Sequence, residues 1–374
     1  MVRRKLNCVL AFTCVFTLAS AMVRAEVAAA PATSAVTYRK LDLQPIDGAV
    51  RGAFGPAIGA AFEKEIEDDF GEVTKIPLKT EQIDLGRMLF YETRLSKNQQ
   101  ISCNTCHQLD KYGVDGESTS PGHKKQRGGR NSPTVYNAAG HFSQFWDGRA
   151  KDVEEQAKGP ILNPIEMAMA SGEQVIQVLE SMPGYVEAFK KAFPDDKTSI
   201  TYDNIAAAIG AFERKLITPS PFDKFIAGDD GAMNAEEKKG FQVFVAAGCV
   251  TCHSGPVLGG RMYQKAGLVK PWPDIKDMGR FDLTKGEGDR HVFKVPSLRN
   301  IAKTAPYMHD GSVHDLNRQV QMMARHQLAV ELSPADVKSI VTFLHTLTGE
   351  IPTDYIKPPK LPESGPNTPK SVLD

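Results

Sequence analysis

Apolar residues recur at helical spacing in several separate segments of the chain. They lie three or four positions apart, which places them on one face of a helix. These segments are 84–91, 173–181, 185–193, 204–217, 235–246 and 335–347. Glycine and proline interrupt the runs, and no segment shows the sustained alternation typical of a strand. The pattern therefore predicts an all-α protein with long loops.

The first 25 residues have a different pattern. Positions 3–5 are basic, and 6–21 are largely apolar but too few for a comfortable membrane span. Small residues allow cleavage after either Ala21 or Ala25. We interpret 1–25 as a signal peptide, with an uncleaved anchor as the alternative, and expect a periplasmic protein. No other segment is long and apolar enough to cross a bilayer.

The net charge excludes few functions, and it changes when the first 25 residues are removed. The full chain has 45 acidic and 45 basic residues, and this balance gives no indication of nucleic-acid binding. Removal of 1–25 takes four bases and no acid, which leaves 41 bases against 45 acids. A negative mature chain favours a cationic or dipolar protein partner, because opposite charges steer association.

Cysteine spacing carries the first chemical signal. Two of the six cysteines fall in the leader, and the other four form Cys103-Asn104-Thr105-Cys106-His107 and Cys249-Val250-Thr251-Cys252-His253. C-x-x-C-H is the attachment motif of c-type haem. Two thiols three positions apart can add to the two vinyl groups of one haem, and the adjacent imidazole can then reach the iron. The sequence predicts two haem c groups with His107 and His253 as proximal ligands.

Other uses of paired cysteines fit less well. A zinc ribbon needs its two cysteine pairs about 15–20 residues apart. Here the first pair begins at Cys103 and the second at Cys249, which is much too far apart. A thioredoxin-like redox pair requires neither a following histidine nor a second copy. Disulfides are common in exported proteins, but they would not explain a histidine after both pairs.

The two halves share a set of spaced residues. The corresponding positions are Gly86 and Phe90 with Gly240 and Phe244, Pro133 to Asn137 with Pro296 to Asn300, and Asp147-Gly148 with Asp310-Gly311. We interpret this as duplication of a single-haem, cytochrome c-like domain. The expected division is 26–218 for the N-terminal haem domain, 219–350 for the C-terminal haem domain and 351–374 for a Pro-rich tail.

Several longer motifs are also distinctive. They include Arg130 to Val135, Gln144 to Arg149, Glu155 to Pro160, Ile165-Glu166-Met167, Lys294 to Asn300, and His309-Asp310-Gly311. In these motifs, from about Ile83 to Leu347, the chain closely resembles bacterial dihaem cytochrome c peroxidases. The resemblance implies reduction of hydrogen peroxide to water at the N-terminal haem, with the C-terminal haem as a high-potential electron store. It also implies a small cytochrome c or cupredoxin as donor, and a homodimer.

The resemblance assigns the second axial ligands. Met323 matches the family's ligand to the C-terminal haem, and a thioether raises the reduction potential. Its neighbour Met322 is the alternative from the pattern alone, and His309, His314 and His326 are nearby. His123, in a glycine-rich loop, matches the histidine that caps the oxidised N-terminal haem in the family and departs when the other haem is reduced.

Further residues receive roles from the same resemblance. Glu166 matches the catalytic glutamate, Gln156 the pocket glutamine, and Trp146 the aromatic side chain between the haems. Asn131 and the backbone carbonyls of Thr304 and Pro306 match an interdomain calcium site, and such oxygen ligands suit calcium.

Two other functions compete with the peroxidase. A related dihaem oxidase matures a partner protein's tryptophans, but it carries tyrosine in place of Met323 and lacks the His123 segment. A pure electron carrier would have no use for Glu166 and Gln156 beside a haem that can open.

Overall fold

The structure is a computed structural model that describes residues 36–58, 61–67 and 73–372. The predicted signal peptide lies outside these residues. Helices dominate the part of the chain that is described. They are α1 (Gly48–Gly52), α2 (Thr80–Tyr91), α3 (Cys103–Cys106), α4 (Val153–Leu162), α5 (Gly172–Glu180), α6 (Pro183–Ala192), α7 (Tyr202–Glu213), α8 (Pro221–Ile226), α9 (Ala235–Ala247), α10 (Phe281–Thr284), α11 (Leu316–Leu328) and α12 (Pro334–His345).

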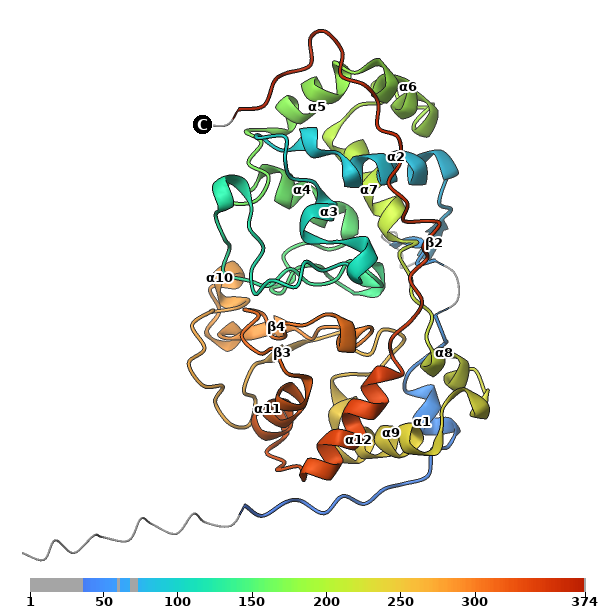
Figure 1. Cartoon of the computed structure of the whole chain (residues 1–374), viewed down its shortest axis with the longest axis vertical. Helices are drawn as coiled ribbons and strands as arrows, with labels where there is room; N and C mark the ends of the chain where they lie inside the picture. Colours follow the sequence, from blue (N-terminus) through green and yellow to red (C-terminus); the bar gives the residue numbers. More distant parts are fainter. Residues whose placement is uncertain (1–35, 59–60, 68–72, 373–374) are drawn as a thin grey trace, which may run out of the picture. The chain divides into compact units, whose positions relative to one another are not determined.

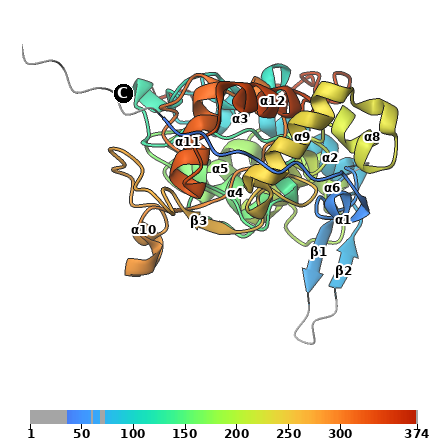
Figure 2. The same cartoon turned by 90° about the horizontal axis from the view of Figure 1, so that it is seen from below.

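Strands contribute only two small antiparallel sheets among the described residues. One pairs β1 (Lys64–Glu67) with β2 (Val73–Ile76), and the other pairs β3 (Tyr263–Lys265) with β4 (Val292–Lys294). Figure 2 shows the β1–β2 hairpin extending away from the helices. The helical fold with long loops confirms the prediction from periodicity. No helix of the described chain is both long and apolar enough to span a membrane.

The repeated glycines mark a close helix crossing in each half. In the first half α2 crosses α7, and a Cβ on Gly86 would stand 1.8 Å from the carbonyl oxygen of Ala208. In the second half α9 crosses α12, and a Cβ on Gly240 would stand 2.1 Å from the carbonyl oxygen of Ser339. Only glycine permits backbones to approach so closely. The duplicated sequence therefore encodes the same crossing twice.

Each half completes its core with residues from the other end of the chain. Phe54, which follows α1, is 2% exposed and packs edge-on against Phe222 and Phe241 of the second half. The segment after α12 runs back along the first half (Figure 1), where the Tyr91 hydroxyl donates to the Ile356 carbonyl oxygen at 2.5 Å. The described residues up to Phe54 thus pack with the second half, whereas the sequence placed them with the first.

A repeated asparagine from each half contacts the same residue, Thr218. Asn137 and Asn300 each adopt a left-handed backbone, with φ of 61° and 60°. Their side-chain amides donate to the same hydroxyl oxygen, that of Thr218, at 2.9 and 2.8 Å. All three residues are buried. This junction places the two copies of the motif around one residue.

We expect Thr218→Val to destabilise the protein by about 2–4 kcal/mol, because two buried amide donors would lose their acceptor and each costs about 1–3 kcal/mol. Denaturant unfolding of the haem-loaded protein measures this loss. Thr353→Val is the matched control, because Thr353 is exposed. Equal stability of the two variants would contradict an energetic role for the junction.

Candidate functional site

Both C-x-x-C-H motifs form short turns that fix the orientation of the histidine. Cys103 to Cys106 is the helix α3, and Cys249 begins a 3-10 turn directly after α9. The Nδ1 atom of His107 lies 3.4 Å from the Gly113 carbonyl oxygen, and Nδ1 of His253 lies 3.2 Å from that of Leu258. Because a carbonyl only accepts, each Nδ1 carries the hydrogen. Each Nε2 therefore presents a lone pair, as an iron ligand requires.

The four motif cysteines form no disulfide among the described residues, and each is half-buried. Burial raises the pKa of Cys106 to about 11 and that of Cys249 to about 12. Redox-active cysteine pairs instead have a lowered pKa that favours the thiolate. The raised pKa values therefore argue against a thioredoxin-like centre.

The second motif opens onto a cavity of about 220 Å³. Cys249, Cys252 and His253 line it, as does Met323 of α11. Met322 is not among the lining residues, although both methionines pack against the apolar cluster that contains Trp272 and Tyr307. A mostly apolar cavity with two thiols, a free imidazole lone pair and a thioether suits a haem c.

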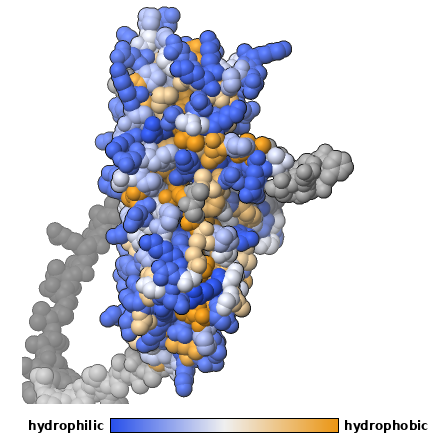
Figure 3. All heavy atoms as spheres, turned by 90° about the vertical axis from the view of Figure 1, so that its right-hand side faces the viewer, coloured by the Kyte–Doolittle hydropathy of each residue, from blue (hydrophilic) through white to orange (hydrophobic). Residues whose placement is uncertain are grey.

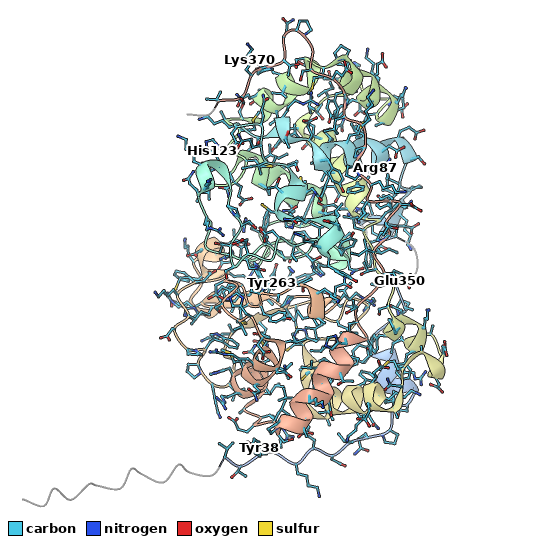
Figure 4. The ribbon with its side chains drawn as sticks, in the orientation of Figure 1. Tyr38, Arg87, His123, Tyr263, Glu350 and Lys370 are labelled. Atoms are coloured by element: carbon cyan, nitrogen blue, oxygen red, sulfur yellow. The ribbon has the colours of Figure 1, made fainter. Side chains whose placement is uncertain are left out.

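His123 is the inward-facing residue of the first motif's glycine-rich loop. Residues 124–129 are exposed, but His123 is only 5% exposed and its Nδ1 atom has no hydrogen-bond partner. Figure 4 shows it at the edge of the first half. Burial, with Lys97 and Lys124 nearby, lowers the pKa of His123 and so favours the neutral imidazole. A neutral, unpartnered imidazole is suited to binding a metal.

Glu166 lies beside this loop and beside the first motif. The His123 backbone N–H donates to the Glu166 carbonyl oxygen at 2.7 Å, and a Cβ on Gly122 would stand 2.1 Å from the Ile165 carbonyl oxygen. Burial is the main cause of the raised pKa of the Cys106 thiol, and the nearby Glu166 carboxylate adds to it. The fold thus brings Cys106, His123 and Glu166 together from three separate segments.

The Glu166 carboxyl is partly buried, as its apolar neighbours predicted. Burial raises its pKa, although Arg149 and the amide of Asn163, which donates to Oε1 at 2.6 Å, act in the opposite direction. A carboxyl with a raised pKa can accept and return a proton nearer to neutral pH. Gln156 is half-buried on α4, the helix that leads into Asn163.

Trp146 lies where the two halves meet. Its indole N–H donates to the Asn131 carbonyl oxygen at 2.9 Å, and its ring is edge-on to the His309 ring at 6.4 Å between centroids. The contacts are reciprocal, because Asn131 N–H donates to the His309 carbonyl and Lys294 N–H donates to the Trp146 carbonyl, at 2.7 and 2.8 Å. Trp146 and His309 occupy equivalent positions before the repeated Asp-Gly.

The predicted calcium ligands face the same cavity. Asn131, Thr304 and Pro306 all line it. The Asn131 side-chain nitrogen donates to the carbonyls of Glu117 and Ser118 at 3.0 and 3.3 Å, which leaves its amide oxygen as the remaining ligand atom. The described residues contain no cluster of three or more His, Cys, Asp or Glu side chains suited to a metal. A cation at this position would be coordinated by uncharged oxygen atoms.

Sequence reasoning left other residues at the interface unassigned. Arg130 of the first half bonds Asp277 of the second at 2.7 Å and Asp147 at 2.6 Å. Burial alone would lower the pKa of Arg130, but these two carboxylates raise it. His141 and Lys294 also line the cavity. Lys294 stands at the position equivalent to Asn131, and comparison of the repeats could have identified it.

Comparison with known families matches two successive parts of the chain. Residues 80–231 match the family described as di-haem cytochrome c peroxidase, and residues 237–348 match the family described as cytochrome c. Among solved structures, a MauG-like protein associated with microbial copper homeostasis superposes with a TM-score of 0.69 at 28% identity, over 76% of this chain and 94% of that one.

Two curated relatives are similar over most of their length. A cytochrome c551 peroxidase of Pseudomonas aeruginosa is 47% identical over 317 residues, which cover 83% of this chain and 90% of that protein. A cytochrome c551 peroxidase of Nitrosomonas europaea is 50% identical over 297 residues, with 79% and 87% covered.

Proposed function

The chain belongs to the di-haem cytochrome c peroxidase family, and we propose that it reduces hydrogen peroxide to two waters with electrons from a small redox protein. The haem c held by the second motif would store electrons, and the haem c held by the first motif would be the site of peroxide reduction. Each turnover consumes two electrons and two protons. Bound haem iron supplies the electron-transfer chemistry and the position at which peroxide coordinates.

Named side chains would hold the two groups. Thioethers from Cys103 and Cys106, with His107, would hold the first haem. Those from Cys249 and Cys252, with His253, would hold the second. Met323 is the proposed second ligand of the C-terminal iron, because it faces the cavity that the attachment residues line.

One observation carries the proposal: the two attachment motifs have unlike surroundings. The second motif shares its cavity with the thioether of Met323, which favours reduced iron. The first lies beside a partly buried carboxyl, Glu166, and beside a histidine on an exposed loop. An electron carrier needs two stable ligand pairs, whereas a peroxidase needs one haem that can open next to an acid–base group.

Glu166 is the proposed proton carrier. Its carboxylate accepts a proton from the inner oxygen of peroxide and returns it to the outer oxygen, so that the O–O bond breaks unevenly and water leaves. Asn163 orients the carboxylate through its amide, and Gln156 is proposed to help position peroxide. Trp146, at the junction of the halves, is the proposed electron relay between them.

Other parts of the proposal extend beyond the site. A signal peptide in 1–25 would export the chain to the periplasm. Asn131, Thr304 and Pro306 would bind calcium between the halves. The electron donor would be a small cytochrome c or a cupredoxin, and the enzyme would act as a homodimer. Much of the face drawn in Figure 3 is hydrophilic, with smaller apolar areas between.

Stepwise reduction followed by optical and EPR spectra, with peroxide turnover assayed in parallel, tests the function. We expect one high-potential His/Met haem and a second haem that becomes high-spin when the first is reduced, together with the onset of turnover. Two haems that stay low-spin at every potential, without peroxide turnover, would identify an electron carrier instead.

The proposed ligand role of His123 has its own test. We expect His123→Ala to make the N-terminal haem high-spin in the fully oxidised enzyme and active without prior reduction, because the iron would already be open. EPR of the oxidised protein measures this. Lys125→Ala is the control, since Lys125 is an exposed residue of the same loop. An unchanged low-spin spectrum in His123→Ala would refute ligation by His123.

A further inference from the structure

Lys294, the last residue of β4, places an ammonium group in the interior of the protein. Its side chain belongs to a residue that is only 7% exposed, and it lines the same cavity as Cys249 and His253. Burial lowers the pKa of Lys294 to about 8, so the group is still largely cationic at neutral pH. A buried cation is costly unless an anion or several hydrogen-bond acceptors compensate it.

The described residues provide only one partner for this ammonium. Its Nζ atom lies 3.2 Å from Nδ1 of His141, which belongs to the first half, and no described carboxylate forms an ion pair with it. Burial first, and then the nearby Lys294 charge, hold the pKa of His141 well below its usual range. The imidazole is therefore neutral, and it cannot compensate the positive charge.

The hydrogen-bond pattern leaves donors without acceptors. Nδ1 of His141 faces a donor, so it accepts and the ring hydrogen stands on Nε2. That Nε2 atom is buried and has no partner. An ammonium also has three donors, and His141 accepts from one of them. Donors from both halves thus line one cavity and lack acceptors among the described residues, and an anionic group would satisfy them.

We infer that Lys294 binds a propionate carboxylate of the haem attached at Cys249 and Cys252, with His141 positioning the ammonium from the opposite half. The haem is an anion source that the attachment motif itself brings into this cavity, and a carboxylate matches the charge of Lys294. The inference rests on the bound haem but not on peroxide turnover. A fixed cation beside the haem also disfavours ferric iron and so raises the reduction potential.

Redox titration of the C-terminal haem in the full-length holoenzyme tests the inference. We expect Lys294→Leu to move the ferric–ferrous equilibrium about tenfold toward the ferric form, a decrease of about 59 mV for one electron. Lys294→Arg should keep the potential near that of the wild type, because it keeps the charge. Lys265→Leu is the matched control, since Lys265 is exposed on the adjacent strand β3.

A measurement on the unaltered enzyme covers the case in which Lys294→Leu fails to incorporate haem. In the half-reduced protein, resonance Raman spectra excited at the ferrous haem report the propionate bending band. We expect this band to shift between H2O and D2O, because the proposed donors exchange their hydrogens. A potential that is unchanged in a fully loaded Lys294→Leu variant, or a band insensitive to D2O, would overturn the assignment.

Discussion

Glu166→Gln is expected to lower kcat for peroxide by about 10²–10⁴-fold while both haems remain attached. Glutamine keeps the size and the contact with Asn163 but cannot accept a proton from peroxide. The partly buried setting of Glu166 makes this loss specific to proton transfer. Steady-state turnover with a reduced donor measures it, and optical spectra confirm the haem content.

The pH profile adds a second measurement for the same residue. Burial raises the pKa of Glu166 above its ordinary value of 4.5, and the proposed role needs the ionised carboxylate. Activity should therefore fall as the pH drops through this raised pKa, and the acid limb of kcat/KM should lie above pH 4.5. Glu180→Gln changes an exposed carboxyl of the same half, and it should leave both kcat and the acid limb of the pH profile unchanged. Unchanged turnover in Glu166→Gln would show that the mechanism is wrong.

Met323→His is expected to lower the reduction potential of the C-terminal haem by on the order of 0.2 V, within the ~0.8 V range that axial ligands control. Imidazole stabilises ferric iron more than a thioether does. The charge-transfer absorption of sulfur-ligated ferric iron should disappear as well. Electron transfer from the donor should then become slow, because the lowered reduction potential of the C-terminal haem makes its reduction less favourable.

Met322→His is the matched control for the ligand. Met322 precedes Met323 on α11 and packs against the same apolar cluster, but only Met323 lines the cavity. Its replacement should leave the potential and the charge-transfer absorption unchanged. If Met322→His removed the absorption and Met323→His kept it, the two methionines would have to exchange roles.

Helix periodicity was sufficient to predict much of this fold. The segments with apolar residues at helical spacing became α2, α5, α6, α7, α9 and α12. Periodicity did not predict α4, because Gly159 and Pro160 are residues that usually interrupt a helix. The start of this helix is nevertheless capped by Asp152, whose side chain accepts from the Glu155 N–H. The family resemblance, now confirmed, supplied more of the chemistry than periodicity could.

The motifs predicted which residues matter but not how they meet. Spacing alone could not show that His123 donates its backbone N–H to the carbonyl of Glu166, because that contact joins two loops. Nor could it show that Lys294 is buried opposite His141. Such contacts depend on how the halves dock, and no local pattern in one segment encodes that docking.

Each half uses residues from the far end of the chain in its core, so neither half should fold as a separate fragment. A fragment cut at Thr218 would lose Phe54 from the second core, and the tail that carries Ile356 would leave the first. A protease that nicked this boundary would therefore leave a non-covalent complex, not two free cytochromes. Each half therefore depends on the other end of the chain to complete its core.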